Sequence, residues 1–295
     1  MGDSTMRVFV VGATGAAGRP LVDALLAAGH EITAMSPGPR LDQLPPAVRR
    51  LRAGLLDADL EDVLPSRLAG HDAVVNLATA VPADDDDPRG WDLDSSIRET
   101  GSPRLARLVA QVGVPVLVQL SISMIYPVRG AEWIDESVPI DSDPERAALV
   151  GPTAAMEEAV IELPRTCAWT ILRAARFVGP ATIQDRQREL LRAGKLPIPG
   201  DGSTFVSHVH VADVADAVLA VLDRRPSGEI LNLAAEPVTY ESYLTRLARI
   251  DGAPQPAVDA DLEPDLDNQR IDSGRAQRLL GWTARRGNWP EAIAG

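Results

Sequence analysis

The chain has 295 residues, of which 45% are hydrophobic and 24% charged, a composition typical of a soluble globular protein and unlike that of a disordered or fibrous chain. Acidic residues outnumber basic ones by 42 to 29, and the net charge of -13 argues against nucleic acid and anionic membranes as partners. We find no apolar run long enough for a membrane span and no signal-peptide pattern, so we expect a cytoplasmic protein with a small-molecule ligand.

Short apolar runs alternate with helical patterns through the first part of the chain. The first run, Arg7–Val11, has no polar alternation, as expected for a strand that helices cover on both faces. Further strands are predicted at Glu31–Met35, Val48–Arg52, Ala73–Ala78, Val114–Ser121 and Trp169–Arg173. Helices are predicted at Arg19–Ala28, Leu60–Leu68, Asp94–Val112 with a break near Pro103, and Thr153–Leu163. This alternation predicts an α/β protein with a doubly wound parallel sheet.

The pattern changes after about Gly179, where prolines and glycines become frequent. This part is predicted to contain a helix at Val211–Leu222, a strand at Ile230–Leu233, an exposed acidic loop at Ala253–Asn268 and a short helix at Ser273–Leu280. We expect residues 1–178 to form the first domain and residues 179–295 mainly a second lobe, with some elements returning to the first. The acidic run Asp84–Asp87 is interpreted as a solvated loop.

Three glycines follow the first strand directly. Gly12, Gly15 and Gly18 form a GxxGxxG pattern where a strand turns into a helix, so the N–H groups of the loop and the positive end of the helix dipole point at one place. Glycine lets a pyrophosphate approach the backbone closely. A tight connection without a ligand is the alternative, which the βαβ context disfavours.

Five motifs together resemble a known family. They are VVGATGAAGRPLV at residues 10–22, DAVVNLAT at 72–79, QLSISMIYP at 119–127, TILRAARFVGP at 170–180 and VSHVHVADVADAVLAVL at 206–222. In order and spacing they are similar to the extended short-chain dehydrogenase/reductases, or NAD-dependent epimerase/dehydratase family. The resemblance implies an enzyme with a Rossmann domain that binds NAD or NADP and a C-terminal lobe for the substrate, often a nucleotide sugar. For the assembly, a homodimer is one of the alternatives.

The cofactor preference depends on the end of the second strand. An NAD enzyme usually has an acidic residue there to accept the ribose hydroxyls, whereas this chain has Ser36, followed by Arg40. A hydroxyl and a guanidinium suit a 2′-phosphate, so we favour NADP over NAD; an ordinary surface arginine is the alternative. The family's adenine contact falls at Leu55, with Asp57 nearby. The expected cofactor contacts are Gly12, Thr14, Gly15, Gly18, Ser36, Arg40 and Ala78.

The catalytic pair of the family is absent. A Tyr-x-x-x-Lys motif would use the lysine to lower the tyrosine pKa, but Lys195 is the only lysine of the chain, and the two positions fall at about Val150 and Ala154. Any acid/base chemistry must therefore use a non-standard group. The candidates for it are Ser121, Ser123 and Tyr126.

Arg176 and His208 are the candidate substrate contacts, although hydrogen bonds that hold a local loop explain them equally well. For His208-x-His210 with Asp213, packing or substrate contact is favoured over a metal site, and no metal is expected. Cys167 is interpreted as a core residue. We expect the substrate pocket between the carboxyl ends of the strands and the lobe after Gly179.

Three functions remain open. The first is an epimerase, dehydratase or reductase that acts on a sugar nucleotide or a specialised metabolite. The second is a redox-silent dinucleotide sensor or regulator of the NmrA type. The third is redox-neutral chemistry, such as cyclisation or dehydration, on the same fold. The full length of the C-terminal region favours an enzyme over a trimmed sensor.

Overall fold

The computed structural model describes residues 5–81, 88–264 and 268–290, so the Asp84–Asp87 run lies outside the described residues. The chain divides into two compact units. Unit 1 comprises Met1–Ser121, Ser142–Arg173 and Ala215–Leu231, and unit 2 comprises Ile122–Asp141, Ala174–Val214 and Asn232–Gly295. Within the described ranges, no helix combines the length and apolar character needed to cross a bilayer.

A seven-stranded parallel sheet dominates unit 1, which confirms the predicted fold class. In spatial order its strands are β12 (Glu229–Leu233), β7 (Ala168–Ala174), β5 (Val116–Ile122), β4 (Ala73–Asn76), β1 (Arg7–Val11), β2 (Glu31–Met35) and β3 (Arg49–Leu51). The strand β1 lies in the middle, with Val8 opposite Ile32 of β2 and Ala73 of β4. Every residue of β4 is buried, as the continuous apolar run predicts.

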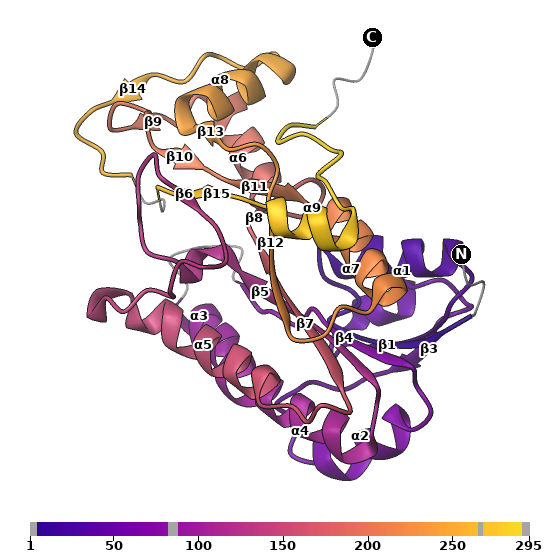
Figure 1. Cartoon of the computed structure of the whole chain (residues 1–295). Coiled ribbons are helices and arrows are strands. Elements are labelled where there is room, and N and C mark those ends of the chain that lie inside the picture. The colour runs from indigo at the N-terminus through magenta and orange to yellow at the C-terminus, as the bar shows by residue number, and fades with distance from the viewer. Residues whose placement is uncertain (1–4, 82–87, 265–267, 291–295) are drawn as a thin grey trace. The chain divides into compact units, whose positions relative to one another are not determined.

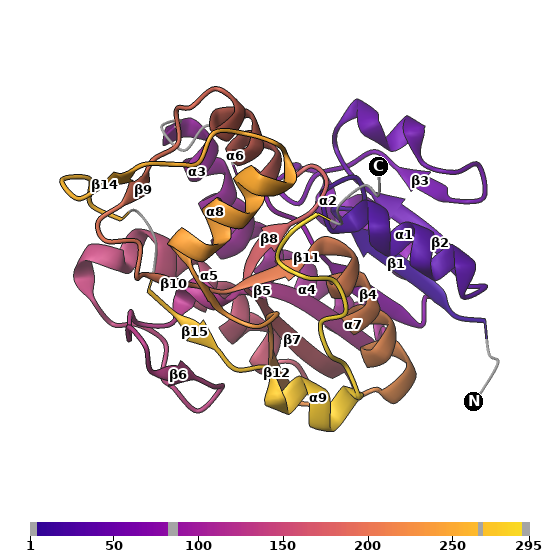
Figure 2. The same ribbon diagram turned by 90° about the horizontal axis from the view of Figure 1, so that it is seen from above.

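Helices cover both faces of this sheet. The helices of unit 1 are α1 (Gly18–Ala27), α2 (Leu60–Leu68), α3 (Pro88–Ser96), α4 (Ser102–Val112), α5 (Ala147–Ile161) and most of α7 (Val211–Arg224). In Figure 1, α2, α4 and α5 lie on one face, and Figure 2 shows α1 and α7 on the other. One continuous core of strand and helix side chains, including Phe9, Leu105 and Ile171, lies under α2, α4 and α5.

Two helices differ from the prediction. The break expected near Pro103 is instead a π-helical segment, η2 (Ile97–Gly101), and Pro103 lies in the first turn of α4, directly after this segment. The helix α5 starts at Ala147, before the predicted Thr153, and includes Pro152. A proline inside a helix is unfavourable, and Pro152 is tolerated here in a helix whose apolar side chains are largely buried.

Unit 2 consists of short strand pairs and three helices. The parallel pairs are β8 (Arg176–Val178) with β11 (His208–His210), β9 (Ile198–Pro199) with β14 (Val258–Asp259) and β6 (Trp133–Ile134) with β15 (Arg270–Ile271); β10 (Phe205–Val206) pairs with β13 (Val238–Thr239) antiparallel. The helices are α6 (Ile183–Arg192), α8 (Tyr240–Ile250) and α9 (Gly274–Leu280). Strand β14 lies inside the predicted acidic loop 253–268 and is exposed, as expected for that loop. Its pairing with β9 was not predicted.

Candidate functional site

The glycine loop between β1 and α1 is packed so tightly that two of its positions admit no side chain. Gly12 has a φ of +77°, and a Cβ there would lie 2.7 Å from the backbone of Leu77. A Cβ on Gly18 would lie 2.2 Å from the carbonyl oxygen of Gly12. Both distances are shorter than any real contact, so these two glycines are required by the fold itself.

Gly15 is different, because a Cβ there would meet only the carbonyl oxygen of Gly12, at 3.3 Å. The first turn of α1 contains no acidic residue that would repel an anion from the helix N-terminus. A side chain at Gly15 would therefore be tight against a single backbone atom, a far milder conflict than at Gly12 or Gly18. This geometry fits the pyrophosphate of a nicotinamide dinucleotide.

Other predicted cofactor residues lie around the same loop. The hydroxyls of Thr14 and Ser36 are hydrogen-bonded at 2.8 Å and both side chains are buried, which ties the end of β2 to the glycine loop. The backbone of Ala78 lies next to Gly12, since its N atom would be 2.8 Å from a Cβ on that glycine. Arg40 lies exposed on a 3₁₀ turn, η1 (Pro39–Gln43), beyond Ser36.

The two adenine candidates differ in exposure. Leu55 is buried, and its carbonyl oxygen accepts a hydrogen bond from Arg104 Nη1 at 3.1 Å. Asp57 is exposed, and its carboxylate accepts the N–H of Gly54 at 2.8 Å. The sequence analysis missed Arg52, which follows β3 and donates to the carbonyl oxygen of Gly38 at 2.8 Å. In the sequence, the one feature that could have identified Arg52 is its position at the end of a predicted strand.

Among the catalytic candidates, Ser121 belongs to a buried ionic network in unit 1. Its hydroxyl donates to Glu157 Oε1 at 2.5 Å. Arg173 on β7 donates to both carboxylate oxygens of Glu157, at 3.0 and 2.6 Å, and both side chains are about 5% exposed. The sequence analysis did not predict Glu157, which lies on α5. The hydroxyl of Ser121 is thus already engaged as a hydrogen-bond donor to this carboxylate.

Tyr126 and Ser123 lie in unit 2. Tyr126 is fully buried, and its hydroxyl donates to Asn232 Oδ1 at 2.9 Å. Ser123 begins a 3₁₀ turn, η3 (Ser123–Ile125), and its buried hydroxyl lies 3.9 Å from the sulfur of Met124, a weak acceptor. Of the three catalytic candidates, Ser123 therefore has the weakest internal hydrogen bond.

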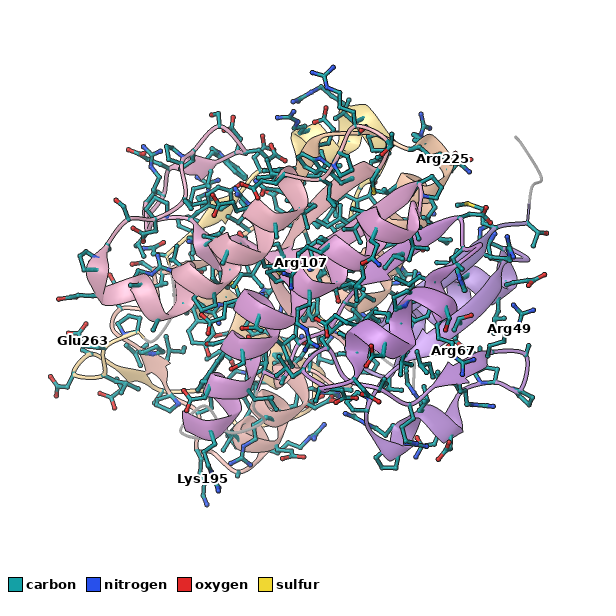
Figure 3. The ribbon with its side chains drawn as sticks, turned by 90° about the horizontal axis from the view of Figure 1, so that it is seen from below. Arg49, Arg67, Arg107, Lys195, Arg225 and Glu263 are labelled. Atoms are coloured by element: carbon teal, nitrogen blue, oxygen red, sulfur yellow. The ribbon has the colours of Figure 1, made fainter. Side chains whose placement is uncertain are left out.

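The two positions at which the sequence analysis expects the family's catalytic pair carry no ionisable group. Val150 is buried and Ala154 partly buried, both on α5. Lys195, the only lysine of the chain, follows α6 and is exposed, as Figure 3 shows. No lysine is therefore available on α5 to lower the pKa of a phenol.

The two substrate candidates are direct neighbours in unit 2. Arg176 on β8 stands opposite His208 on the parallel strand β11. His208 is buried with its ring centroid 4.3 Å from that of Tyr243, and its Nδ1 has no hydrogen-bond partner. Burial, and then the positive charge of Arg176, lowers the pKa of His208 to about 3. The imidazole is therefore neutral at physiological pH and presents an unpaired nitrogen beside a guanidinium.

The other members of the His-x-His pattern have structural partners. His210 Nδ1 accepts the N–H of Ala212 at 3.1 Å. Asp213 accepts hydrogen bonds from the guanidinium and the backbone N–H of Arg286, at 2.6 and 2.9 Å. Among the described residues, no group of three or more His, Cys, Asp or Glu side chains is arranged to hold a metal ion.

Known proteins similar to this chain are named as reductases, epimerases and dehydratases. A 3-diazoavenalumate denitrifying reductase of Streptomyces sp is 33% identical over 94% of this chain and 88% of its own. A UDP-glucose 4-epimerase of Mycolicibacterium smegmatis is 30% identical over 94% and 93%. The structure of DesIV, a dTDP-glucose 4,6-dehydratase of Streptomyces venezuelae solved with NAD, matches with a TM-score of 0.81 at 22% identity, covering 96% of this chain and 93% of that one.

The match to the family as a whole agrees with the residues described above. The profile of the family described as NAD dependent epimerase/dehydratase covers residues 8–234, from β1 to the end of β12. This range includes the glycine loop and the end of β2, which are the residues predicted to form a dinucleotide cradle. The chain therefore belongs to the NAD dependent epimerase/dehydratase family.

Proposed function

We propose that this protein is a reductase of a specialised metabolite that prefers NADPH and delivers hydride to a strongly electrophilic group, such as a diazo group. One observation carries the proposal: the chain contains no Tyr-x-x-x-Lys sequence, and the hydroxyls of Ser121 and Tyr126 already donate to Glu157 and Asn232, whereas the glycine loop predicted to hold the dinucleotide is present. The chain thus keeps the parts needed for hydride chemistry without a built proton relay.

The missing pair restricts the reactions that this chain can catalyse well. A phenol without a nearby cation has a pKa near 10, and a serine hydroxyl is a still weaker acid. Loss of a general acid or base typically costs about 10²- to 10⁴-fold in rate. A substrate that is electrophilic enough to accept hydride without simultaneous protonation avoids that cost, whereas an ordinary ketone or sugar hydroxyl does not.

A diazo group meets this requirement. In the zwitterionic form of an ortho-hydroxyaryl diazo compound, one hydride forms a carbon–hydrogen bond at the diazo carbon, the carbon–nitrogen bond breaks and its electron pair leaves with N₂, which provides the driving force, and the phenolate oxygen takes up one proton. The proton can come from water, so no tyrosine–lysine pair is needed. The name of the Streptomyces relative, a denitrifying reductase of a diazo acid, supports this substrate class for a chain that is 33% identical to it.

Each part of the site has a role in this proposal. The glycine loop would hold the pyrophosphate through its N–H groups, and Ser36 would face the ribose. The nicotinamide supplies the hydride. In unit 2, Arg176 and the neutral imidazole of His208 would contact the substrate, and Ser123 would donate a hydrogen bond to its polar atoms.

A sugar-nucleotide epimerase is the second candidate, supported by the Mycolicibacterium relative at 30% identity. Epimerisation of a secondary alcohol removes a hydroxyl proton together with the hydride and later returns both. That cycle depends on a base at the reacting hydroxyl, and this chain has no lysine-activated tyrosine to provide one. We therefore favour the reductase.

An isotope experiment separates the two candidates. The protein is incubated with NADPH carrying deuterium at the transferred position and an ortho-hydroxyaryl diazo acid, and separately with UDP-glucose. We expect one deuterium in the product at the former diazo carbon, one equivalent of oxidised nucleotide and release of N₂, all detected by mass spectrometry. Gly15→Val is the control that should abolish turnover. Interconversion of UDP-glucose without net consumption of nucleotide, and no reaction of the diazo acid, would establish the epimerase instead.

A further inference from the structure

An arginine that the sequence analysis did not identify lies against the loop that follows β2. In the register of the parallel pair, Met35 stands opposite Leu51, so Arg52 follows β3 at the level where Ser36 follows β2. The N–H of Ser36 donates to the carbonyl oxygen of Leu51 at 3.2 Å. The guanidinium of Arg52 reaches back along this loop and donates to the carbonyl oxygen of Gly38 at 2.8 Å.

This loop is where the adenosine ribose of a dinucleotide is expected. In sheets of this topology, the residue at the end of the second strand contacts the 2′ position, and a carboxylate there selects NAD. Here that residue is Ser36, whose side chain is fixed by its hydrogen bond to Thr14 of the glycine loop. A 2′-phosphate on a ribose that contacts Ser36 would therefore lie beside residues 37–38, the part of the loop on which Arg52 lies.

In the structure, the guanidinium of Arg52 forms an ion pair with the carboxylate of Asp42, which belongs to the same loop region. Arg52 Nη2 donates to both carboxylate oxygens of Asp42, at 2.8 and 2.7 Å. The two side chains are 47% and 68% exposed. Exposed ion pairs of this kind contribute little to stability. A phosphate dianion forms stronger, bidentate hydrogen bonds with a guanidinium, so it would displace Asp42 readily.

We propose that Arg52 is the guanidinium that binds the 2′-phosphate of NADPH, and that Asp42 competes with the phosphate for it and so sets the margin by which NADPH is preferred. The inference rests on the NADPH preference of the proposed function and names the residues that produce it. Arg40, the candidate from the sequence, lies on η1, and the proposal assigns the main phosphate contact to Arg52 instead.

Nucleotide binding tests the proposal without any substrate. The dissociation constants of NADPH and NADH are measured by calorimetry for wild type, Arg52→Ala, Asp42→Asn and Arg40→Ala. We expect Arg52→Ala to weaken NADPH binding about 10-fold or more, as for loss of a charge-assisted bidentate contact, and to change NADH binding less than about twofold. Asp42→Asn should strengthen NADPH binding about threefold, since it removes the competitor, and leave NADH binding unchanged.

Arg49→Ala is the matched control, because Arg49 also lies at β3, is exposed and pairs with Glu31 at 3.1 Å (Figure 3). It should leave both constants unchanged. Equal weakening of NADPH and NADH by Arg52→Ala would show that Arg52 only supports the loop. No change in that variant, or a loss confined to Arg40→Ala, would likewise overturn the proposal, as would weaker NADPH binding in Asp42→Asn.

The dissociation constants of the wild-type protein test the proposed cofactor preference, and those of the variants test the role of Arg52. The ratio of the NADH and NADPH constants in wild type tests the cofactor preference of the proposed function, and a ratio in favour of NADH would overturn that preference and this inference together. A preference for NADPH that survives Arg52→Ala in full would overturn only the inference.

Discussion

His208 shows how far the folded environment changes a residue whose type was evident from the sequence. The sequence predicts a polar contact at this position, and nothing in it indicates that the imidazole is buried beside Tyr243 and next to the charge of Arg176. These neighbours lie 35 and 32 positions away in the chain, too far for a local pattern to reveal them. The neutral state of the ring follows from this packing.

The lowered pKa of His208 predicts how stability depends on pH. The unfolded chain takes up a proton near the ordinary value of 6.5, while the folded protein takes it up only near pH 3. Between these values the unfolded state binds more protons, so stability is full above pH 6.5 and falls as the pH is lowered, by about 1.4 kcal/mol per pH unit from this residue.

We expect His208→Phe, which keeps a ring of similar shape, to lose this part of the pH dependence. Urea unfolding at several pH values between 4 and 8 measures it, and the difference between the free energies of unfolding of variant and wild type is the relevant quantity. A difference that stays constant with pH would contradict the buried neutral state.

Among the contacts between helices and strands, the buried ion pair that joins α5 to β7 is expected to have a large effect on the free energy of unfolding. Glu157 and Arg173 form an ion pair that is almost fully removed from water, and Ser121 adds a third hydrogen bond. Removing one partner of such a pair leaves an uncompensated buried charge and typically costs about 3–5 kcal/mol, whereas replacing both by apolar residues is often close to neutral.

We therefore expect Glu157→Met to destabilise the protein by about 3–5 kcal/mol, and the double variant with Arg173→Met to recover most of this loss. Ser121→Ala is the control, because the ion pair stays intact and the cost should be smaller, about 1–3 kcal/mol. Denaturant unfolding of all three variants measures the effect. A double variant as unstable as the single one would show that the pair contributes net stability.

The central strands and most of the helices around them were predictable, because long apolar runs and helical periodicity are local signals. The π-helical segment Ile97–Gly101 was not, since it depends on Gly101 lying close to Leu55, where a Cβ would be 2.8 Å from the leucine Cβ. The strand pairs of unit 2 were missed because strands of two or three residues have no periodicity to detect.

The candidate site, like the fold, was predictable where its signals are local in the sequence. Glycine spacing and strand order predict the position of the glycine loop, whereas the contacts of Arg52 and Glu157 depend on pairings across the sheet and between a helix and a strand. Such pairings are properties of the folded chain, and a single sequence does not contain them.

For the whole molecule, nucleotide binding should appear as added stability. At a concentration about 100 times the dissociation constant, NADPH would stabilise the folded state by about 2.7 kcal/mol and raise the Tm by roughly 5 °C. Gly15→Val should lower the Tm of the free protein less than a substitution at Gly18, because a Cβ there would meet only the carbonyl oxygen of Gly12, at 3.3 Å, and should lose the shift with NADPH.

Gly18→Val is the contrasting variant, since its side chain has no space and should lower the Tm of the free protein itself. Thermal scans with and without nucleotide measure both. A Tm shift in Gly15→Val as large as in wild type would show that the glycine loop is not where the nucleotide binds.

Cys167 has a practical consequence for experiments on this protein. It is the only cysteine of the chain, it is 3% exposed, and burial raises the pKa of its thiol to about 11. The thiolate is the reactive form, so alkylating reagents at neutral pH should leave Cys167 untouched. A cysteine introduced on the exposed turn at Arg40 would then be the one site to which a fluorophore or spin label couples, and the native sequence can serve unaltered as the background for such labelling.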